Sequence, residues 1–128
     1  MIRTGAAALS LLWPLPLAAK PLSETLYPAV DCAALHLGRD DAARRLRHLP
    51  RDTEDPARAE AFRQAAIRLN GGAVAGVDEA IAAARPAMRL LLESLVLDQD
   101  LQSRDLYERL LGTCARFAQG APEFDALR

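Results

Sequence analysis

Apolar residues recur at helical spacing along most of the chain after about residue 20. Phe62, Ala65 and Leu69, for example, share one face of a helical wheel. No stretch alternates apolar and polar residues over the length of a strand. The one Asn-Gly pair, at residues 70 and 71, follows a helical pattern, where glycine acts as a helix stop. The pattern therefore predicts an all-α fold.

Capping residues, glycines and prolines divide this pattern into segments. Gly38 predicts the end of a first helix, and Pro50 predicts the end of a second. Asp55 followed by Pro56 has the form of an N-cap and a first helical position. We expect helices over residues 24–37, 41–49, 55–69, 78–97 and from 101 or 104 to 118.

Two features of segment 78–97 bear on the architecture. Pro86 lies inside it, so either one helix kinks there or one helix ends near Ala84 and another begins at Pro86. The run from Met88 to Leu97 is apolar on nearly all sides. An all-round apolar helix is typical of a buried position, so we expect this run to be the central, most buried helix.

The end of the chain is expected to leave the bundle. Gly120 and Pro122 end the last helix, and the tail from about residue 120 is predicted to be loose. No repeat of 20 to 50 residues is visible. The sequence thus predicts a small single domain over residues 20–128, a bundle of four to five short helices.

The first 19 residues have a different character from the rest. Arg3 is the only charge before Lys20, and small or apolar residues run from Gly5 to Leu17. This order is typical of a secretory signal peptide, and the apolar segment of about 13 residues is shorter than the roughly 20 of a membrane-spanning helix. We predict cleavage near Ala19, and the many arginines and alanines indicate a GC-rich bacterium. The protein would then lie in a Gram-negative periplasm or be secreted; a buried N-terminal helix is the alternative.

The chain has two cysteines, Cys32 in the first predicted helix and Cys114 in the last. An even cysteine count in an oxidising compartment favours a disulfide, here a staple across the bundle. Closing a loop of about 83 residues would stabilise the fold by roughly 4–5 kcal/mol. Two free buried thiols are one alternative. Another is a Cys32–His36 dyad on one helical face, although such a base needs a third group to orient it.

The two histidines do not form a recognisable metal or haem site. His36 and His48 lie 12 residues apart across a predicted helix break, without a His-Glu-x-x-His or Cys2His2 pattern. Covalent haem attachment would need Cys-x-x-Cys-His, which is absent. Non-covalent haem would have to use Met88 with His36, and Met88 is more simply explained as a core residue. We predict no metal and no cofactor.

Other catalytic patterns are also absent from the sequence. Asp98 and Asp100 could open a calcium loop, but its sixth position is Ser103 and its twelfth is Arg109, where glycine and glutamate are needed. There is no Gly-x-Ser-x-Gly nucleophile motif, and the glycine-rich segment 71–76 lacks the lysine of a phosphate loop. We therefore predict a protein that is not an enzyme, and the sequence does not locate a ligand-binding site.

The charge balance narrows the choice of partner. Without residues 1–19 the chain keeps 15 basic and 17 acidic residues, with the signs interspersed. A nucleic-acid-binding protein would show a basic patch, and nothing here favours an anionic membrane surface or a stable membrane span after signal removal. These observations favour a chaperone-like or accessory protein that contacts another envelope protein. The alternative is a carrier of a small apolar ligand between helix 78–97 and the last helix.

Intact mass spectrometry of the protein purified from the envelope of its host tests export and the disulfide together. We expect the mass of residues 20–128 less two hydrogens, because export removes the signal peptide and an oxidising compartment forms the bond. A mass that includes Met1 and two free thiols would contradict both expectations.

Overall fold

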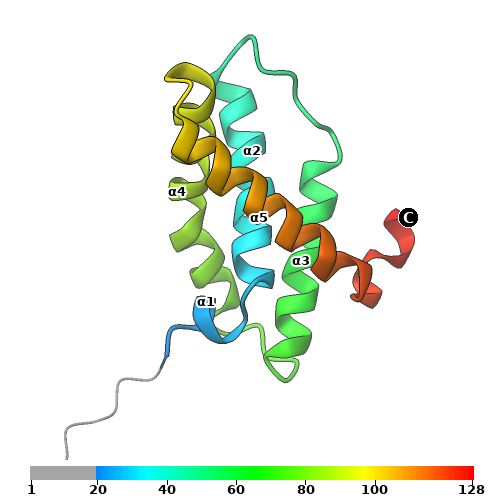
Figure 1. The fold of residues 1–128 in the computed structure, drawn as a ribbon. Coiled ribbons are helices and arrows are strands. Elements are labelled where there is room, and N and C mark those ends of the chain that lie inside the picture. The colour runs from blue at the N-terminus through cyan, green and yellow to red at the C-terminus, as the bar shows by residue number, and fades with distance from the viewer. Residues whose placement is uncertain (1–19) are drawn as a thin grey trace, which may run out of the picture.

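The computed structural model describes residues 20–128, so the predicted signal peptide at residues 1–19 lies outside the described residues. This part of the chain forms the predicted all-α bundle (Figure 1). Its elements are α1 (Leu22–Thr25), α2 (Ala29–Arg45), α3 (Asp55–Leu69), α4 (Val77–Leu97), α5 (Leu101–Gln119) and the 3-10 helix η1 (Pro122–Leu127). Within residues 20–128, no helix is both long enough and apolar enough to cross a membrane.

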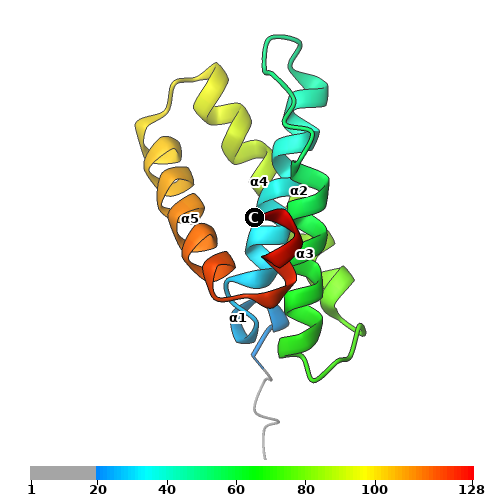
Figure 2. The ribbon, with the colours of Figure 1, turned by 90° about the vertical axis from the view of Figure 1, so that its right-hand side faces the viewer.

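The helix at the centre of the bundle is α2. It lies between α3 and α4 and packs extensively against both, and α5 crosses it (Figures 1 and 2). Ten of its 17 residues are buried, and half of these are alanine or glycine, whose small size lets two helices approach it closely. The prediction that residues 88–97 form the most buried helix is wrong, because only Val77, Ile81 and Leu92 of α4 are buried.

Gly38 does not end a helix, so the prediction of separate helices over 24–37 and 41–49 is wrong. The single helix α2 runs through it, and Gly38 is the point where α4 comes closest. A Cβ atom at this position would lie 2.7 Å from the backbone nitrogen of Arg89 and 2.8 Å from Cβ of Met88. The glycine is therefore required by helix–helix packing and not by a turn.

Pro86 does not divide α4, which is one continuous helix from Val77 to Leu97. Proline removes the hydrogen bond that residue 86 would donate to the carbonyl of Ala82. Both Pro86 and Ala82 are exposed, so water can satisfy that carbonyl. The helix therefore tolerates the proline on its solvent side.

The other two long helices begin and end close to their predicted limits. α3 has the predicted bounds. Asp55 is not its N-cap, because Glu54 occupies that position and the side chain of Asp55 is buried without capping the helix. α5 begins at Leu101. The side chain of Asp100 caps it by accepting hydrogen bonds from the backbone N–H groups of Gln102 and Ser103.

The C-terminal tail is not loose, contrary to the prediction. Residues 122–127 form η1, and Phe124 is buried against Phe62 of α3 with ring centroids 4.5 Å apart. Arg68 of α3 also forms an ion pair with Glu123, at 2.5 Å. An apolar anchor and a charged contact thus hold the tail on the bundle.

A disulfide joins Cys32 of α2 to Cys114 of α5, which confirms the predicted pairing. The two Cα atoms are 5.6 Å apart, and both side chains are almost fully buried. α5 makes few other contacts with α2, and its contacts with α4 are limited. The disulfide is therefore the main attachment of α5 to the central helix.

Charged pairs add links between α2 and its neighbours. Arg85 of α4 donates two hydrogen bonds to the carboxylate of Asp41, at 2.6 and 2.7 Å. These hydrogen bonds lower the pKa of Asp41, although partial burial acts in the opposite direction. Asp40 accepts hydrogen bonds from Arg44 and from Arg51, which ties the loop after α2 back onto the helix.

The packing at Gly38 predicts how two glycines will respond to substitution. Gly38→Ala should lower the free energy of unfolding by about 1–3 kcal/mol, because the added methyl group meets the backbone of α4. Gly112→Ala is the control within α5: its nearest new neighbour is the movable end of Arg116 at 3.4 Å, so it should stabilise by about 0.5–1 kcal/mol. Urea unfolding of both variants measures the difference, and equal effects would refute the close-packing role.

Candidate functional site

An open apolar groove lies between α4 and α5. We call it the α4–α5 groove; it has a volume of about 420 Å³. Its lining residues come from both helices, from the turn before α2 and from the first turn of α2: Tyr27, Asp31, Ala87, Met88, Leu90, Leu91, Ser94, Leu106 and Leu110. The lining is almost entirely apolar because the C-terminal half of α4 is rich in leucine and only part of this helix is buried.

Large apolar side chains are exposed in the groove and beyond it. Leu90 of α4 and Leu106 of α5 both line it and are each 52% exposed. At the turn between the helices, Leu97 is 63% exposed and Leu101 is 75% exposed. Five of the nine exposed large apolar side chains in residues 20–128 lie on α4 and α5, so the exposure is concentrated on this hairpin.

Asp31 is the one ionisable residue in the groove lining. Burial raises the pKa of its carboxyl group. Within residues 20–128 no cationic side chain forms an ion pair with it and no side-chain hydrogen bond reaches it. The α4–α5 groove thus combines an apolar wall with a single carboxyl group that lacks a cationic partner.

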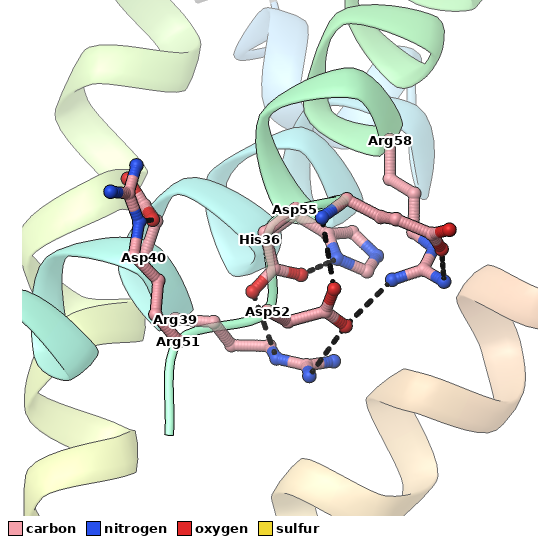
Figure 3. Close-up of polar contacts among 8 residues, drawn as sticks. His36, Arg39, Asp40, Arg51, Asp52, Asp55 and Arg58 are labelled. Atoms are coloured by element: carbon pink, nitrogen blue, oxygen red, sulfur yellow. Dashed lines mark hydrogen bonds and ion pairs between the residues drawn. The ribbon is translucent and has the colours of Figure 1, made fainter. Parts of the chain in front are cut away.

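A second feature is a buried polar cluster between α2 and α3 (Figure 3). Nδ1 of His36 lies 2.9 Å from Oδ1 of Asp55, and both side chains are almost fully buried. The Asp55 carboxylate can only accept, so Nδ1 carries the hydrogen. Arg39 lies 3.5 Å from Oδ2 of Asp55, so the carboxylate has a positive neighbour as well.

Asp52, in the loop before α3, links two arginines at the edge of this cluster. It accepts a hydrogen bond from the backbone N–H of Glu54 and another from Arg58, both at 2.9 Å, and Arg39 lies 3.6 Å away. These contacts lower the pKa of Asp52, and the backbone hydrogen bond has the largest effect. On the α5 side, burial raises the pKa of Tyr107, and the charge of Arg39 opposes that shift.

The structure also settles the hypotheses for the individual sequence candidates. Cys32 is bonded to Cys114, so both the Cys32–His36 dyad and the free thiols are ruled out as alternatives. His36 instead pairs with Asp55. Sequence reasoning missed this partner because Asp55 followed by proline has the form of a helix cap. An aspartate about two turns before Phe62 on the same helix, with a histidine on a neighbouring helix, was the only available signal.

The remaining candidates are not brought together. His36 lies in the cluster facing α3, whereas Met88 lines the α4–α5 groove, so the two do not form a haem-binding pair. Asp100 caps α5 and does not open a calcium loop. In the described part of the chain, no group of three or more His, Cys, Asp or Glu side chains could hold a metal ion.

Comparison of the chain with protein families, with curated proteins and with solved structures found no match. The α4–α5 groove and the polar cluster are therefore the features that bear on function.

Proposed function

We propose that this protein is a non-enzymatic, chaperone-like or accessory protein of the bacterial envelope that binds an amphipathic helix of another envelope protein. The α4–α5 groove is the proposed docking site. The single observation that carries the proposal is the exposed apolar surface along this groove, in a domain most of whose other large apolar side chains are at least partly buried. Exposed apolar patches of this kind are typical of interaction sites.

The length of the apolar surface favours a helix over a small ligand. On α4 the apolar side chains recur from Ala87 through Leu90 and Leu91 to Leu97, which is the repeat of one helical face. This stripe is about 15 Å long by helical rise, or two to three turns. Leu97, at its end, lies outside the groove lining, so a molecule that only filled the groove would leave it exposed.

Asp31 adds a requirement on the partner. Its partly buried carboxyl group lies at the α2 side of the groove, without a cationic neighbour in residues 20–128. A lysine or arginine on the docked helix would supply that charge, which would give both affinity and orientation. We therefore propose an occupant with an apolar face of two to three turns and one basic residue beside it.

The runner-up function is a carrier of a small apolar ligand. One observation favours it: the volume of about 420 Å³ lies within the range of small-molecule sites. A carrier should release a bound molecule of a few hundred daltons when the native protein is denatured in a mass spectrometer. A helix-binding protein should not.

Site-specific photocrosslinking in the native envelope tests the proposed function. A benzophenone side chain replaces Leu106 in the groove, and the control replaces Leu69, which is similarly exposed but lies on α3, away from the groove. We expect an adduct to one protein from position 106 and none from position 69. Mass spectrometry of the adduct should place the crosslink in an amphipathic helix with a basic residue.

A synthetic peptide of that helix then tests the contacts. Leu90→Glu should weaken its binding at least tenfold, and Asp31→Asn should weaken it about three- to tenfold, whereas Leu69→Glu should leave it unchanged. Three results would contradict the proposal: adducts equally from both positions, an adduct to a second copy of this chain, or a released small ligand. The last of these would establish the carrier.

A further inference from the structure

A cavity of about 390 Å³ is separate from the α4–α5 groove, and the two share no lining residue. It is bounded by α2, α3, α5 and η1. Its wall has a polar side, formed by His36, Arg39, Asp52 and Arg58, and an apolar side that includes Phe62, Leu111 and Phe124. A mostly apolar cavity with a few convergent polar groups is the usual form of a small-ligand site.

His36 is fixed in one orientation at the wall of this cavity. Asp55 holds Nδ1, and the imidazole ring stacks on Phe62 with centroids 5.5 Å apart and an interplanar angle of 13°. In residues 20–128 no hydrogen bond occupies the second ring nitrogen, Nε2, which is on the far side of the ring from Asp55 (Figure 3). Since His36 lines the cavity, Nε2 is the nitrogen available to a ligand there.

Two guanidinium groups lie beside His36 at the same wall. Arg39 makes only long contacts, of 3.5 and 3.6 Å, with its two carboxylate neighbours, so its N–H groups are not used in close hydrogen bonds. Arg58 donates to Asp52 and to Glu54. A guanidinium carries five N–H donors in a planar fork that matches a carboxylate, and Arg39 has most of these donors free.

We propose that this cavity binds a small monocarboxylic acid with an apolar body. The carboxylate would accept hydrogen bonds from Arg39, and also from Nε2 of His36 when the ring carries a hydrogen there as well as on Nδ1. The hydrocarbon would pack on Phe62, Leu111 and Phe124. Asp52 also lines the cavity, but its carboxylate already accepts hydrogen bonds from Arg58 and from the backbone N–H of Glu54, which leaves Arg39 as the charged group open to a head group. An uncharged head group would leave the donors of Arg39 without a charge partner. This proposal does not depend on the function of the α4–α5 groove.

Titration of the disulfide-bonded protein with octanoate, followed by NMR, tests the proposal. 1-Octanol and octylammonium serve as probes with the same hydrocarbon chain and a neutral or positive head group. Octanoate should shift the backbone resonances around the cavity and the ring resonances of His36. Octanol should bind at least tenfold more weakly, and octylammonium should not bind in the cavity.

Two variants separate head-group recognition from occupancy of the cavity. Arg39→Gln should weaken octanoate binding about tenfold or more and bring it close to that of octanol. Ala118→Leu should abolish binding by filling the cavity from α5 without a change of charge. Arg116→Gln is the control, because it removes a charge from α5 outside the cavity lining.

Three outcomes would overturn the proposal. Equal binding of octanoate and octanol would mean that the charged wall does not recognise the head group. Resonance shifts that map to the α4–α5 groove and persist in Ala118→Leu would indicate general apolar adsorption. No shift at any octanoate concentration below its micelle range would exclude the site altogether.

Discussion

The disulfide between Cys32 and Cys114 is the interaction on which both candidate sites depend. It joins α5 to the centre of α2, and α5 has few other contacts with the bundle. Closing an 82-residue separation contributes about 4–5 kcal/mol in the chain-entropy model, against a typical domain stability of about 5–15 kcal/mol. One face of α5 forms a wall of the α4–α5 groove, and another face forms a wall of the cavity at His36. A single covalent bond therefore positions walls of both candidate sites.

The small residues of α2 determine which apolar side chains remain exposed. Because alanines and Gly38 let α3 and α4 approach closely, the core of the bundle is narrow and forms around α2. A narrow core cannot bury every leucine of α4, so Leu90 and Leu97 remain on the surface. The polar cluster has the same origin: a central helix that packs against α3 and α4 also buries His36, and Asp55 of α3 compensates for it.

The sequence predicts the fold class, the bounds of α3 and the disulfide, because these depend on local periodicity, capping and cysteine count. It does not predict that α2 is the central helix. A helix rich in alanine shows no strong apolar stripe in the sequence, even when it is the most buried helix of the bundle. The prediction that Gly38 ends a helix is wrong for a related reason. A single sequence does not distinguish a glycine that ends a helix from a glycine that lets a neighbouring helix pack closely. The tail and the His36–Asp55 pair depend on contacts between distant segments, Phe124 with Phe62 and α2 with α3. The local sequence pattern carries no information about contacts between such distant segments.

Hydrogen exchange of the oxidised and the reduced protein, read by mass spectrometry, tests the role of the disulfide most directly. If the bond is the main attachment of α5, reduction should remove amide protection from α5 and η1 by a larger factor than from α3, which keeps its contacts with α2. The α4–α5 hairpin would then open before the rest of the bundle unfolds. Protection of α5 that survives reduction, or is lost only together with that of α2 and α3, would contradict the account.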